Sequence, residues 1–301
     1  MQIYHTPHLL GIVDYTVKNR FRPDADTIHL LNPVLLELGK EIKPKNGKLE
    51  VWMPGNNHPF NITLKALKDG TPYVTIRLEG VDAPEEHYRA MPFTIKKGQK
   101  KITYPLDKNK KQGERSQPMW KPGTDFVLGV LEKAKYALIE LDSEVIDSHN
   151  RVLGYVYSSD SQGRKKTFVT LELLKRGLAF PFIFESAKDY IETFLRAAMN
   201  ARKNRYGVWK HYKEKPLTYN ETYPSPKHHT DLEPKEQASA ALNFPMVFRR
   251  IVDSYQLKGL SLKEALQKYD TIDYETGKMV TGDKYDHIPI DRRIWAPHSY
   301  K

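Results

Sequence analysis

Acidic and basic residues gather in three short segments of the sequence, each beside a pattern typical of a β-strand. The first is Asp24–Leu30, DADTIHL, in which carboxylates at a turn lead into a strand. The second is Arg77–Glu85, RLEGVDAPE, in which a strand runs into an acidic turn. The third is His149–Tyr157, HNRVLGYVY, with an arginine where a strand begins. All three would present charged side chains at strand ends.

These residue types suit the cleavage of a phosphodiester, which requires a hard divalent cation, fixed positive charge and a base for water. Carboxylate oxygens from separate turns, as at Asp26 and Asp82, are the ligands that calcium and magnesium prefer. Guanidinium groups, as at Arg77 and Arg151, can grip phosphate oxygens through a bidentate fork that lysine cannot form. A third carboxylate beside the cation, Glu85, can activate or orient water.

Each of these residues also has an ordinary structural interpretation. Aspartates such as Asp26 are common in turns, and Arg77 could pair with Glu79 or with a neighbouring strand. The turn that holds Glu85 could simply lead into a helix, and Arg151 could face solvent. The residue types alone therefore leave both interpretations open.

Hydrophobic periodicity predicts a small closed barrel with helices packed on it. Helical spacing appears at 124–136, behind a Thr124/Asp125 cap, and at 168–175 and 189–205. Two later helical patterns, at 248–256 and 260–269, precede an irregular Asp/Pro-rich end. The predicted strands are 12–17, 26–31, 48–53, 60–67, 71–81, 136–142 and 151–158.

Composition excludes several classes of protein. The chain has 301 residues, a net charge of +11 and no cysteine, so disulfides, thiolate metal sites and cysteine catalysis are excluded. No apolar run approaches the ~20 residues of a membrane-spanning helix, so we expect no membrane partner. The chain starts without the pattern of a secretory signal, and we expect a cytoplasmic protein, with secretion by a non-classical route as the alternative. The excess positive charge suggests a polyanionic partner.

Most of the clustered positive charge lies in one stretch, Lys96–Arg115, which Gly and Pro residues interrupt and which we predict to be a loop. One interpretation is a solvated loop that lysine keeps soluble. The other is a cationic arm that contacts phosphates, which is favoured by its position directly after the segment that ends at Glu85. The residues expected to make those contacts are Lys96, Lys97, Lys100 and Lys101.

The three segments, in this order and at these spacings, resemble those of the staphylococcal (thermonuclease) nuclease family. The resemblance runs from about Gly11 to Lys210 and includes LLKRGLA at 173–179 and GVW at 207–209. It implies an α+β fold, an OB-type five-stranded β-barrel with three packed helices, inserted loops and a C-terminal extension. The roles that it implies are metal binding for Asp26 and Asp82, phosphate binding for Arg77 and Arg151, and general-base action for Glu85.

The resemblance also implies a division of the chain. A nuclease-like domain would cover 1–210, with insertions near 31–60 and 90–120. A linker would follow at 211–240, and an accessory segment at 241–301.

One part of the family pattern is absent. Where the family has tyrosines lining a nucleotide pocket, this chain offers His149 and either Phe182 or Phe184. Stacking on a base remains available to these rings, whereas tyrosine hydrogen bonding does not carry over. No base preference can therefore be assigned.

The resulting hypothesis is a calcium-dependent endonuclease that acts on DNA, and also on RNA, with little sequence specificity and leaves 3′-phosphates. Calcium is expected in preference to magnesium or manganese, and a monomer is the default, with no protein partner indicated. The alternative is a catalytically silent OB-fold module that binds nucleic acid or protein. A further alternative is an assembly protein whose C-terminal sixty residues bind a partner.

Overall fold

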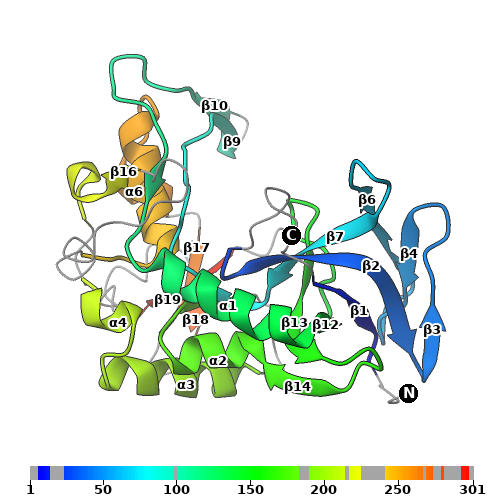
Figure 1. Ribbon diagram of the computed structural model, residues 1–301. Coiled ribbons are helices and arrows are strands. Elements are labelled where there is room, and N and C mark those ends of the chain that lie inside the picture. The colour runs from blue at the N-terminus through cyan, green and yellow to red at the C-terminus, as the bar shows by residue number, and fades with distance from the viewer. Residues whose placement is uncertain are drawn as a thin grey trace.

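A computed structural model gives the three-dimensional arrangement of the chain (Figure 1). It describes residues 6–13, 24–97, 100–182, 190–213, 217–224, 241–266, 269–273, 279–280 and 293–297. In this part of the chain, no helix is long and apolar enough to cross a membrane.

Five strands close into a barrel. Their order is β13 (Val152–Ser159), β12 (Tyr136–Glu140), β1 (His8–Ile12), β2 (Thr27–Glu37) and β7 (Pro72–Leu78). Neighbours in this order are antiparallel, and a parallel pairing of β7 with β13 closes the ring. The predicted α+β fold with an OB-type five-stranded barrel is confirmed.

The burial pattern explains why these sequences form barrel strands. Side chains of β2 alternate between buried and partly exposed positions, and Ile28 and Leu30 point into the core. All eight residues of β13 are buried, because the barrel interior covers one of its faces and helix α2 (Val169–Lys175) contacts it as well. A strand buried on both faces reads as a nearly continuous apolar run, as β13 does.

Three helices pack against this barrel: α1 (Trp120–Ala134), α2 and α3 (Ile191–Lys203) (Figure 1). The predicted cap of the first helix is wrong, because α1 begins at Trp120, before Thr124. The hydroxyl of Thr124 donates to the carbonyl of Trp120, 3.3 Å away, within the helix. Proline is tolerated in a first helical turn, so the PG pair at 122–123 does not stop the helix.

Within the segment expected to be an insertion, near 31–60, residues 31–37 continue barrel strand β2. Beyond them lie β3 (Lys40–Ile42) and a hairpin of β4 (Lys48–Val51) with β5 (Phe60–Thr63). The short strand β6 (Lys65–Ala66) then pairs with β7. These elements project from one end of the barrel (Figure 1).

The basic stretch is only partly the loop that we predicted. Its first residues belong to a hairpin of strands β9 (Phe93–Lys97) and β10 (Lys100–Tyr104), whereas 105–114 lie outside the helices and strands. The base of the hairpin holds a hydroxyl pair, Thr94 with Thr103 at 2.9 Å, and a ring contact between Phe93 and Tyr104 at 5.2 Å. Cross-strand pairs of this kind stabilise a hairpin, and the density of lysine conceals them in the sequence.

The described part of the C-terminal region packs against the barrel domain. Helices α6 (Pro245–Gln256) and α7 (Leu262–Leu266) carry buried apolar side chains that join the common core. The ring of Phe244 lies 4.6 Å from that of Phe180 and 5.2 Å from that of Tyr212. The division of the chain into domains stays a prediction, but residues 241–266 share one core with the barrel.

The described parts of the last residues form three short paired strands: β17 (Tyr269–Asp273), β18 (Met279–Val280) and β19 (Arg293–Pro297). The other residues of the expected irregular end lie outside the described residues. The second helical pattern ends at Leu266 and does not reach Tyr269.

Candidate active site

The first two acidic segments meet at one place on the barrel because of strand register. Thr27 of β2 pairs with Arg77 of β7. Asp26 therefore lies at the end of β2 beside Arg77, and its carbonyl accepts a hydrogen bond from the amide of Leu78 at 2.8 Å. After β7, the chain turns into the short strand β8 (Gly80–Asp82).

Gly80 permits that turn. Its φ is +89°, and a Cβ at this position would lie 2.3 Å from the ring of Phe194 in α3. Both the backbone conformation and the close approach of the ring require glycine. The sharp turn returns Asp82 toward Arg77, five residues earlier in the chain.

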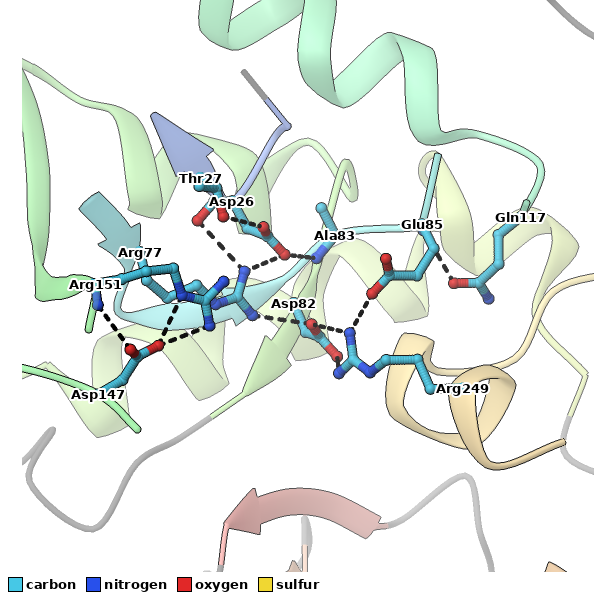
Figure 2. Close-up of polar contacts among 10 residues, drawn as sticks. All are labelled: Asp26, Thr27, Arg77, Asp82, Ala83, Glu85, Gln117, Asp147, Arg151 and Arg249. Carbon is cyan, nitrogen blue, oxygen red and sulfur yellow. Dashed lines mark hydrogen bonds and ion pairs between the residues drawn. The ribbon is translucent and has the colours of Figure 1, made fainter. Parts of the chain in front are cut away.

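Arg77 joins the two candidate metal carboxylates (Figure 2). Its Nη2 donates to Asp82 Oδ1 at 2.9 Å, and its Nη1 forms an ion pair with Asp26 Oδ2. Asp26 also accepts from the amide of Ala83 at 2.9 Å and from the hydroxyl of Thr27 at 3.1 Å. All three charged side chains are buried, so their charges interact strongly.

Burial and neighbouring charges shift the pKa values of the two aspartates of the first segment, Asp24 and Asp26, in opposite directions. Burial alone would raise the pKa of Asp26, but the adjacent Arg77 charge outweighs it and lowers that pKa. Burial opposes the charge of Arg77 in turn, yet the two aspartates raise its pKa. Burial, together with the nearby Asp26 carboxylate, raises the pKa of Asp24 well above its usual range. The Arg77 charge therefore favours the carboxylate form of Asp26, whereas burial and the Asp26 charge disfavour the carboxylate form of Asp24.

Glu85 lies on the segment that follows β8. Its amide donates to the side-chain oxygen of Gln117 at 3.2 Å, and its carbonyl accepts from the Gln117 amide at 2.8 Å. Burial raises the pKa of Glu85 to about 7, although the positive charge of Arg249 opposes the shift. A carboxyl with a pKa near neutrality suits a group that accepts a proton from water.

Arg249 is the site residue that sequence reasoning missed. It comes from helix α6, and its Nη2 lies 2.9 Å from Asp82 Oδ2 while its Nη1 pairs with Glu85 Oε1 (Figure 2). In the sequence it appears only as one basic residue within a helical pattern. No local signal could have connected it to carboxylates that lie more than 160 residues away.

Arg151 immediately precedes β13, the strand beside β7. Leu153 pairs with Arg77 in the parallel register, and side chains two residues apart share a face of a strand. Arg151 is thus placed on the same side as Arg77. Its guanidinium is held by Asp147, with both Nε and Nη2 at 2.7 Å from Asp147 Oδ2.

The residues proposed to contact nucleic acid lie in different surroundings. Lys100 and Lys101 are exposed on the β9–β10 hairpin, and His149 is exposed in the turn before Arg151. Phe182 is buried in strand β15 (Phe180–Phe182), which pairs with β8, and this burial does not favour stacking on a base. The side chains of Lys96 and Lys97, and all of Phe184, lie outside the described residues.

Asp26 and Asp82 fit a divalent cation in their chemistry. They are oxygen donors from separate segments, close enough to share one guanidinium, and hard cations prefer such ligands. Within the described residues, no group of three or more His, Asp or Glu side chains could hold a metal ion. Calcium takes 6–8 oxygen ligands, so most would have to be backbone carbonyl, water or phosphate oxygens.

Comparison with known proteins agrees with this geometry. Residues 75–211 match a family described as Staphylococcal nuclease homologue, which confirms the predicted resemblance over that range. Arg77, Asp82, Glu85 and Arg151 fall inside the match; Asp26 and Arg249 fall outside it. The chain is also 28% identical over 202 residues to Endonuclease YhcR of Bacillus subtilis (strain 168). That alignment covers 66% of this chain and 11% of YhcR, so the chain spans a small part of that relative.

Proposed function

We propose that this chain, a staphylococcal nuclease homologue over residues 75–211, is a metal-dependent endonuclease that hydrolyses phosphodiester bonds of DNA and also of RNA. The observation that carries the proposal is the buried contact of Arg77 with both Asp26 and Asp82, beside a Glu85 carboxyl whose pKa lies near 7. The substrate class follows from the family match and from the name of the endonuclease relative.

In this proposal, Asp26 and Asp82 would hold the divalent cation, for which calcium is our choice over magnesium or manganese. When bound, the cation would supply positive charge that polarises a phosphate oxygen and neutralises charge on the phosphoryl group. To bind the cation, Asp82 would have to give up part of its contact with Arg77 and Arg249, because both of its oxygens accept hydrogen bonds from these guanidinium groups.

Glu85 takes the proton from the attacking water. The water oxygen forms a bond to phosphorus as the bond from phosphorus to the 5′ oxygen breaks. The 5′ oxygen gains a proton from solvent and leaves as a hydroxyl, and a 3′-phosphate remains. Arg77 and Arg151 stabilise the charge that develops on the phosphoryl oxygens. For this role, Arg151 has to share its guanidinium between Asp147 and phosphate, and its half-buried position leaves part of it accessible.

The test is cleavage of labelled single- and double-stranded DNA and RNA in calcium, in magnesium and in chelator, with the end groups identified. We expect cleavage in calcium that chelator abolishes and products that end in 3′-phosphate. Binding of nucleic acid without cleavage under any of these conditions would instead support the silent OB-fold module.

A further inference from the structure

Helix α6 lies beside the candidate site because buried polar contacts fix it to the segment that follows Glu85. The Tyr88 hydroxyl donates to Asp253 Oδ1 at 2.8 Å. The Gln256 side-chain amide donates to the carbonyl of Gly113 at 2.8 Å. Asp253 and Gln256 are both buried, and buried hydrogen bonds of this kind specify one arrangement.

The start of α6 is tied to the same segment. Gln117 forms hydrogen bonds with both the amide and the carbonyl of Glu85. Its side-chain amide also donates to the carbonyl of Asn243 at 2.8 Å. Asn243 is itself buried and accepts from the amide of Leu217 at 2.8 Å. One glutamine thus connects the Glu85 backbone to the entry of α6.

From this position Arg249 spans two carboxylates with different proposed roles (Figure 2). Its Nη1 and Nη2 lie 3.3 and 2.9 Å from the two oxygens of Asp82, and the same Nη1 pairs with Glu85. A planar guanidinium fixes the direction of each contact, which an ammonium group does not. Arg249 therefore sets the separation and orientation of Glu85 relative to Asp82.

Charge balance supports the same conclusion. Arg77 pairs with Asp26 and Asp82, whereas Arg249 pairs with Asp82 and Glu85. Carboxylates in a buried cluster repel one another unless cations lie between them. Arg249 is the guanidinium between Asp82 and Glu85.

We propose that Arg249 is a positioning residue of this site, supplied by a helix outside the matched family region, and that it holds Glu85 in place for proton transfer from water. This inference rests on the proposed nuclease function. It makes residues beyond 211 part of the active site.

The proposal predicts opposite changes in two measurements. Removing Arg249 releases Glu85, so turnover falls. Removing it also deletes a positive charge that contacts a proposed metal ligand, so a divalent cation binds more tightly. A helix residue that only stabilised the fold would, when removed, weaken both properties.

The experiment compares Arg249→Ala and Arg249→Lys with wild type, using DNA cleavage, calcium titration by calorimetry and thermal unfolding. We expect kcat of Arg249→Ala to fall by about tenfold or more with little change in KM, because small misplacements of a catalytic group are costly. Arg249→Lys keeps the charge without the fork and should recover only part of kcat. Calcium should bind Arg249→Ala more tightly than wild type.

The matched control is Arg164→Ala. Arg164 is an exposed arginine paired with Asp160 at the end of β13 opposite Arg151, and its variant should behave as wild type in both measurements. Wild-type or faster turnover of Arg249→Ala, or a joint loss of turnover, calcium affinity and thermal stability, would overturn the proposal. If the wild type cleaves no substrate, the nuclease assignment fails separately. The calcium titration then decides whether Arg249 acts on the site carboxylates.

Discussion

The guanidinium of Arg249 pairs with the carboxylate of Glu85, although 164 residues separate them in the sequence. Barrel strands β2 and β7, with the short strand β8, position Asp26, Arg77 and Asp82, while helix α6 reaches the same cluster from the other side (Figure 2). The candidate site is therefore built from two parts of the chain that share one core.

Replacing Arg77 should destabilise the cation-free protein strongly. The Arg77→Ala variant leaves two buried aspartates without the guanidinium that they share. We expect a loss of about 3 kcal/mol in the free energy of unfolding. Calcium should restore part of this loss, since it supplies the missing charge. Urea unfolding with and without calcium measures both effects. Equal unfolding curves for Arg77→Ala and for the surface control Arg164→Ala would contradict this account of the cluster.

The turn at Gly80 should tolerate no side chain. Gly80→Ala combines an unfavourable φ of +89° with a Cβ 2.3 Å from the ring of Phe194. Gly55 has a similar φ of +84° with nothing within 4 Å, so Gly55→Ala isolates the backbone cost of about 1 kcal/mol. Thermal or urea unfolding should show a cost for Gly80→Ala that is larger by about 2 kcal/mol or more. Equal costs would mean that Phe194 does not confine this turn.

The contribution of His8 to stability should be lost as pH falls from about 6.5 to about 4. Burial lowers the pKa of His8 from 6.5 to about 4, so the unfolded chain binds a proton in this range more readily than the folded protein does. The contribution is fully present above pH 6.5 and is lost on acidification, by roughly 3 kcal/mol at pH 4. Urea unfolding at several pH values should show that the free energy of unfolding of His8→Gln falls less between pH 6.5 and 4 than that of wild type. The same pH dependence in both proteins would mean that His8 titrates normally in the folded protein.

The sequence predicted the elements whose signals are local. Alternating apolar residues marked the barrel strands, and the spacing of Arg77, Asp82 and Glu85 marked the central segment of the site. Contacts between distant segments could not be predicted. The Arg249 contacts depend on how α6 packs, and the β9–β10 hairpin depends on cross-strand pairs that lysine obscures.

The basic hairpin should contribute to nucleic-acid affinity by binding phosphates. Replacing Lys96, Lys97, Lys100 and Lys101 with alanine should flatten the slope of log K against log salt by ~0.9 for each phosphate that is no longer neutralised on duplex DNA, or ~0.7 on single strands. A control replaces Lys40 and Lys43, two exposed lysines in and just after β3, well away from the β9–β10 hairpin (Figure 1). Salt-dependent binding measurements that give the same slope for all three proteins would exclude the hairpin as a phosphate-binding arm.

Glu85, as the group that accepts the proton from water at a phosphodiesterase site, can be tested directly against its neighbour Glu86. The measurement is the DNA cleavage rate of Glu85→Gln and of Glu86→Gln in calcium, with folding checked by circular dichroism. Loss of a general base lowers rates by about 10²–10⁴-fold, so we predict a loss of this size for Glu85→Gln and nearly full activity for Glu86→Gln. Wild-type cleavage by Glu85→Gln, or a loss confined to Glu86→Gln, would contradict the account.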